Sequence, residues 1–114
     1  MITLKEVIKR ADVLRSNAIE QQTKATWVYR LECEVHLAFG DEIPKNTWPL
    51  DMELRCPAPY DNIYELYLVA MIDYYHGESD TYANDMDMFN AAWNEARAYI
   101  RRTNRPKSEG GWKI

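Results

Sequence analysis

The sequence is poor in the residues that interrupt helices. It has four glycines and five prolines among 114 residues, and residues 1–39 contain neither type. Residues 60–105 contain only Gly77. Both residue types are costly inside a helix, so these two stretches are expected to be helical. The helix-breaking residues gather at 40–59 and after 105, where connections are expected.

Other scarce features exclude whole classes of protein. The longest apolar run is a handful of residues, too short to cross a membrane. The first residues lack a basic segment leading into an apolar stretch, so no secretory signal is expected. Two cysteines cannot build a disulfide framework, and the chain reads as intracellular. Four Trp, eight Tyr and two Phe supply enough apolar surface for a folded core, so a disordered chain is not expected.

Charge is distributed unevenly along the chain. The net charge is −4, but residues 97–114 carry six basic side chains against the single carboxylate of Glu109. The first 96 residues hold eight basic and 17 acidic side chains. An acidic body with a basic tail argues against a protein that coats nucleic acid with its whole surface.

The spacing of apolar residues predicts an all-α domain with about four helices, at roughly 3–15, 18–39, 60–76 and 78–103. The first begins at a capping box formed by Thr3 and Glu6, and the same spacing recurs at Asn17 and Glu20. Gly40 is expected to end the second helix. Residues 1–105 are expected to form one domain, followed by a basic tail at 106–114.

Two segments point away from an ordinary helical bundle. Met52, Leu54 and Cys56 alternate with charged residues, which predicts an extended arm or short strand at 41–57. The helix around 63–75 is apolar on nearly every side, and 114 residues offer few neighbours to cover it. A second subunit is therefore expected to cover part of that helix.

No group of residues has the pattern of a catalytic or metal site. Cys33 and His36 share a helical face, but Cys56 and His76 have no ligand-pair spacing, so zinc is disfavoured. The carboxylates near 78–87 fit the positive end of a helix, and they lack the spacing of a calcium loop. We expect a protein that is not an enzyme and has no catalytic, cofactor-binding or metal-binding residues and no cofactor. The many tyrosines are expected to pack in the core or at an interface rather than to line a ligand pocket.

The basic tail supplies the candidate partner-binding residues. Its cations could grip phosphate or an acidic protein, or could simply complement the dipole at the end of a helix. Trp112, which follows two glycines, is typical of an aromatic side chain that docks into a groove. The candidates are Arg101, Arg102, Arg105, Lys107 and Trp112.

Several motifs resemble those of one group of small phage and prophage proteins. They are Pro57-Ala58-Pro59-Tyr60-Asp61, LYLVAMIDYY at 66–75, Gly77-Glu78, MDMFNAAW at 86–93 and the Arg-Pro-Lys ending at 101–107. The resemblance is best over 53–107 and loose before it. Such proteins are similar to the head–tail connector (adaptor) proteins of tailed bacteriophages.

This resemblance implies a structural subunit that assembles as a ring on the phage portal and helps retain packaged DNA. It implies a place at the head–tail junction of the virion, after synthesis in the bacterial cytoplasm. The expected partners are other copies of the chain, the portal, neighbouring neck or tail proteins and, without sequence preference, the packaged DNA; no membrane partner is expected. The arm at 41–56 and the tail at 101–114 are expected to contact neighbouring subunits. Two alternatives stay open: a small assembly or regulatory protein that binds a protein partner without forming a ring, and a module that binds DNA through its tail.

Overall fold

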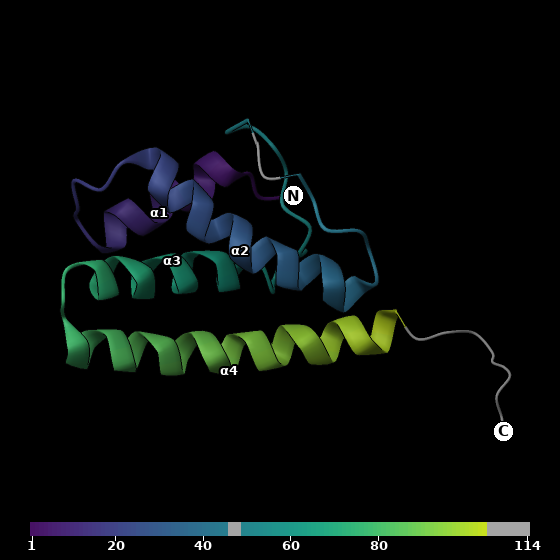
Figure 1. Cartoon of the computed structure of the whole chain (residues 1–114). Helices are drawn as coiled ribbons and strands as arrows, with labels where there is room; N and C mark the ends of the chain where they lie inside the picture. The colour runs from purple at the N-terminus through teal and green to yellow at the C-terminus, as the bar shows by residue number, and fades with distance from the viewer. Residues whose placement is uncertain (46–48, 105–114) are drawn as a thin grey trace, which may run out of the picture.

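The computed structural model describes residues 1–45 and 49–104, and these form four helices. They are α1 (Leu4–Leu14), α2 (Gln21–Phe39), α3 (Asn62–Tyr75) and α4 (Ser79–Thr103). The predicted all-α fold is confirmed. Figure 1 shows α3 in the middle of the molecule, with α1 and α2 on one side and the long α4 on the other.

Helix α3 contacts all three other helices, which explains its apolar composition. Ile63, Leu68 and Ile72 are fully buried within one chain. Most of its apolar surface is therefore covered without a second subunit. The exposed apolar side chains of α3 lie in its last turn, where Tyr74 and Tyr75 keep 64% and 60% of their surface exposed, while Leu66, Tyr67 and Met71 are partly buried.

The prediction for α2 agrees with the structure at the C-terminal end of the helix and differs from it at the N-terminal end. Gly40 ends the helix as expected, in the left-handed conformation with φ of 80°, and its N–H donates to the Leu37 carbonyl. The predicted start near residue 18 is wrong, because α2 begins at Gln21. Asn17 does not cap it: its side-chain oxygen accepts from the Lys24 ammonium and the Ile19 amide instead.

The connection between α2 and α3 lies against the N-terminus of the chain. Leu54 N–H donates to the Ile2 carbonyl, and Leu4 N–H donates to the Met52 carbonyl. Among the described residues of 41–57 this produces one isolated antiparallel bridge, between Thr3 and Glu53, and no strand. The predicted extended arm or short strand is therefore not confirmed.

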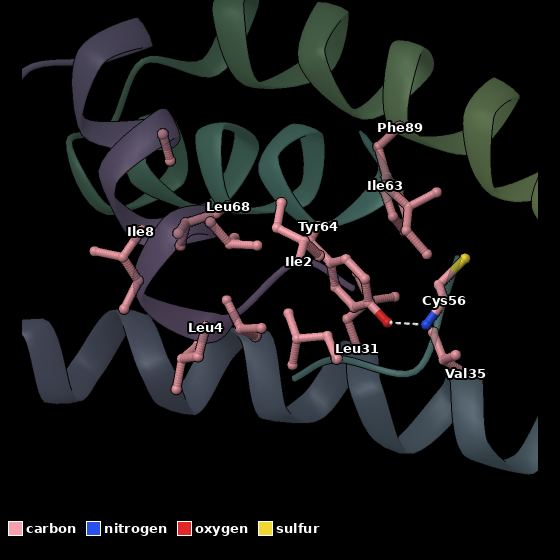
Figure 2. Packing of buried hydrophobic residues seen from close by; sticks show 14 of the residues in the cluster. Ile2, Leu4, Ile8, Leu31, Val35, Cys56, Ile63, Tyr64, Leu68 and Phe89 are labelled. Atoms are coloured by element: carbon pink, nitrogen blue, oxygen red, sulfur yellow. Dashed lines mark hydrogen bonds between the residues drawn. The ribbon is translucent and has the colours of Figure 1, made fainter. Parts of the chain in front are cut away.

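The buried core gathers side chains from all four helices and from the connection. Figure 2 shows Tyr64 and Ile63 of α3 facing Leu31 and Val35 of α2, with Cys56 beside them. The fully buried bulky residues are Leu4, Val7, Val28, Glu32, Val35, Leu54, Cys56, Ile63, Tyr64, Leu68, Ile72 and Ile100. Glu32 is the ionisable residue of this set that the sequence would not place in a core.

Candidate partner-binding surface

The predicted basic site begins on the last turn of α4. Arg101 and Arg102 are both exposed there. Asn104 fixes this end of α4 to the end of α2, because its side-chain amide donates to the Phe39 carbonyl at 2.6 Å. The two arginines therefore project from a held position. Arg105, Lys107 and Trp112, like the tail at 106–114, lie outside the described residues.

Near the opposite end of α4 lies a group of exposed and half-buried aromatic side chains from α2, α3 and α4. We call this group the aromatic turn; it consists of Trp27, Tyr74, Tyr75, His76 and Tyr82. The Tyr74 and Tyr82 rings lie 5.5 Å apart between centroids, and the edge of Tyr75 meets Trp27 of α2 at 6.2 Å. Gly77, with φ of 73°, makes the bend that brings Tyr74 and Tyr82 together.

A partly buried ion-pair cluster lies next to the aromatic turn and joins α3 to α4. Arg15 donates from Nε to both carboxylate oxygens of Asp73 and from Nη2 to both of Asp85, at 3.1–3.3 Å. One cation thus serves two largely buried carboxylates on either side of the turn. Loss of water around Asp85, together with the nearby Asp73, raises the pKa of Asp85, and Arg15 opposes this shift. Arg15 therefore fixes the geometry of the aromatic turn.

A second polar cluster lies in the core, around Glu32. The Tyr64 hydroxyl donates to Glu32 Oε1 and accepts from the Cys56 amide at 2.9 Å (Figure 2). The Arg55 amide donates to Glu32 Oε2 at 2.7 Å, and the His36 ring lies 3.3 Å from the same oxygen. Burial raises the pKa of Glu32 in spite of these hydrogen bonds. The cluster ties the connection before α3 to α2, and its groups bond to one another.

The cysteines and acidic residues considered as site candidates from the sequence do not form a metal site within the described residues. Cys33 and Cys56 are free thiols, and burial raises the pKa of Cys56 to about 12, which disfavours its nucleophilic thiolate. Within residues 1–45 and 49–104, no three side chains of His, Cys, Asp or Glu converge in a way that could hold a metal ion. The carboxylates at the start of α4 differ among themselves: Asp85 pairs with Arg15, while Asp80 and Asp87 face water.

Arg101 and Arg102 are exposed, and the partner-binding role that the sequence suggests for them stays a prediction. Sequence reasoning misses the exposed aromatic end. The tyrosines at 74 and 75 continue an apolar helix, so their spacing alone does not show that α3 ends where its cover ends. The role of Arg15 has no local sequence signal, because its partners are 58 and 70 residues away.

Comparison with protein-family models, with curated proteins and with solved structures finds no match to this chain. Among the described residues, none of the helices combines the length and the apolar character needed to traverse a bilayer.

Proposed function

We propose that the protein is a structural subunit of a tailed phage or prophage, a head–tail connector that assembles as a ring on the portal and helps retain packaged DNA. The resemblance of residues 53–107 to that group supports the assignment. The subunit acts at the head–tail junction of the virion and works by binding, without catalysis. Its partners are other copies of the chain, the portal and the neighbouring neck or tail proteins.

The observation that carries this proposal is the opposite charge of the two ends of α4. Residues 78–90 contain four carboxylates and no basic side chain, whereas residues 91–104 contain three arginines and one glutamate. The helix has 25 residues, so its ends are about 37 Å apart. A rod with unlike ends is complementary to a second copy placed head to tail. Head-to-tail contacts generate rings when the rotation between subunits closes.

The test is the absolute mass in solution by light scattering, across protein concentration and salt. A closed oligomer of many subunits is expected, and its mass should fall in the variant Arg101→Glu/Arg102→Glu. The matched control is Lys5→Glu/Lys9→Glu, which reverses two exposed cations on α1 and should leave the mass unchanged. Equal masses for the wild type and the Arg101/Arg102 variant would contradict the role given to the charged ends.

A monomer at every concentration would leave assembly on the portal as the remaining form of the proposal. In that case the portal encoded by the same phage is mixed with the full chain, and the complex is sought by sedimentation. Binding to the portal that is lost in the Arg101→Glu/Arg102→Glu variant would support the connector role. If the chain neither forms oligomers nor binds the portal, the connector role is wrong.

A second candidate is favoured by the exposed position of Arg101 and Arg102. A small assembly or regulatory protein could bind an acidic partner, or DNA, through this end without forming a ring. DNA affinity that falls steeply with salt would distinguish the DNA-binding form, since each neutralised phosphate releases counterions.

A further inference from the structure

The aromatic turn is an exposed apolar surface of a composition typical of interfaces. More than half of the surface of Tyr74 and of Tyr75 is open to water, and His76 is exposed beside them. The tilted contact of Tyr74 with Tyr82 and the edge-on contact of Tyr75 with Trp27 hold these rings in place, so little conformational entropy is lost when a partner binds. Tyrosine and tryptophan are the residues that most often carry binding energy at interfaces.

The charge around the aromatic turn selects the kind of partner. No lysine or arginine occurs between residues 56 and 96, while Glu78 and Asp80 follow the turn directly and are exposed. Arg15 is already paired with two carboxylates, and Lys24, one turn before Trp27 on α2, is paired with Asp12. Arg30, one turn after Trp27, is the exposed cation on this side, and it lies toward Tyr67. The surface therefore fits a segment that combines an aromatic side chain with positive charge, through ring packing and cation–π contacts.

A second exposed apolar patch fits such a segment less well. Val13 and Leu14 at the end of α1 are 81% and 51% exposed, and Lys9, Arg10 and Glu65 lie beside them, so the net charge around this patch is positive. A basic segment would meet like charge there. The two patches are thus distinguished by the sign of the charge around them.

The segment of suitable chemistry belongs to this chain. Residues 105–114 contain Arg105, Lys107, Lys113 and Trp112, with Glu109 as the one carboxylate. They follow directly after Asn104, which is held at the far end of α4. Eight extended residues span at most about 29 Å. Tyr82, the member of the aromatic turn that lies on α4, is 22 residues before Asn104 and therefore about 33 Å away along the helix. The segment would have to be fully extended to bring Trp112 to the aromatic turn of its own chain, so a second copy is the favoured source.

We propose that the aromatic turn of one copy receives the segment 105–114 of a second copy. The tryptophan packs on the Tyr74 and Tyr75 rings, and the cations face Glu78 and Asp80. Each copy offers one aromatic turn and one segment at opposite ends, so the contact continues from copy to copy. This inference rests on the self-association in the proposed function and names the two surfaces that meet.

The experiment uses full-length chains with a photo-activated benzoylphenylalanine in place of Trp112. Chains with this residue carry ¹⁵N and are mixed with unlabelled wild-type chains, so that a cross-link between different copies is recognised by its isotope pattern. We expect intermolecular cross-links from position 112 to residues 74–82. Cross-links confined to other elements, or none between copies, would overturn the proposal.

A mixing experiment tests the same contact by mass. The variant Tyr74→Ser/Tyr75→Ser has no receiving surface, and the variant Arg105→Glu/Trp112→Ser has no donor segment. Each alone should be monomeric with an unchanged helical circular dichroism spectrum, and an equimolar mixture should form dimers, because one intact contact remains possible. The control Val13→Ser/Leu14→Ser removes a similarly exposed apolar pair and should behave as wild type.

The outcomes separate this proposal from the connector role. Variants that keep the wild-type oligomeric mass would overturn the docking of 105–114 on the aromatic turn, and the connector role would stand on other contacts. A monomeric wild type that binds the portal would likewise overturn the docking and retain the connector role. Loss of both the oligomer and the portal complex in the wild type would refute both.

Discussion

The substitution Tyr64→Phe tests whether the polar cluster around Glu32 holds the core together. Tyr64 is fully buried, and its hydroxyl is both a donor to Glu32 and an acceptor from the Cys56 amide. Phenylalanine keeps the ring and its packing but removes both hydrogen bonds. The change therefore isolates the polar contribution of one oxygen atom.

The expected loss of unfolding free energy is about 3 kcal/mol. Leaving a buried amide without an acceptor costs about 1–3 kcal/mol, and a hydrogen bond to a charged group contributes about 1.5–3 kcal/mol. The sum is reduced because Glu32 keeps the Arg55 amide. For a chain of this length the loss corresponds to a fall in Tm of about 12 °C, at about 4 °C per kcal/mol.

Urea unfolding followed by circular dichroism measures this loss. The midpoint should fall by about 2 M with an unchanged slope, for a slope of about 1.5 kcal/mol per M. Tyr74→Phe is the matched control, since it removes an exposed hydroxyl and should change stability by less than about 0.5 kcal/mol. Glu32→Gln completes a double-mutant cycle, with a coupling of about 1 kcal/mol or more expected. If Tyr64→Phe is as stable as the control, the reasoning about this cluster is wrong.

Two further changes address the ends of the helices. Arg15→Ala leaves Asp73 and Asp85 without their cation and should lower the unfolding free energy by about 2 kcal/mol at pH 7. This value is reduced because Arg15 is partly exposed to water. Adding Asp85→Asn to Arg15→Ala should restore part of the loss. The pKa of Asp85 is raised above its ordinary value of 3.8, so the folded chain holds that proton more tightly than the unfolded chain does. The unfolding free energy should therefore fall as the pH rises from 3.8 through the raised pKa. Urea titrations at several pH values measure this fall, and Asp85→Asn should remove it. Gly40→Ala should lower the unfolding free energy by about 1 kcal/mol, because its φ of 80° is strained for alanine. The added Cβ would meet the Asn104 side chain at 3.8 Å, an ordinary contact, so the backbone strain is the main cost. A Tm unchanged from wild type would contradict this.

The number of helices could be predicted because the glycines and prolines that interrupt helices are few and lie close together in the sequence. Gly40 and the Thr3–Glu6 capping box act within a few residues, and the structure confirms both. Asn17 has the same local spacing to Glu20 as a cap, yet its side chain bonds to Asp12 and Lys24. That preference depends on the packing of α1 against α2, which local spacing does not contain.

In the candidate site, too, some features follow from local sequence and others depend on tertiary packing. The exposure of Arg101 and Arg102 follows from their position at a helix end, so a sequence can place them. The exposure of Tyr74 and Tyr75 depends on how far the neighbouring helices extend along α3, which is a tertiary property. Of the alternating residues, Leu54 and Cys56 are buried and Met52 is exposed. The alternation does not show that the backbone of this segment bonds to the first residues of the chain and to the Glu32 cluster rather than to a neighbouring strand.

The central place of α3 has a consequence for how the chain folds during synthesis. The apolar faces of α1 and α2 are made first, and each needs α3 to cover it. The ribosome therefore releases more than half of the chain before α3 appears, and α4, which adds Phe89, Ala96 and Ile100 to the core, follows later still. We expect that the amino-terminal half is not a separate folding unit, because the core is complete only when α3 and α4 have docked. Interrupting translation before residue 75 would leave a nascent chain with exposed apolar surface, a substrate for chaperones and proteases.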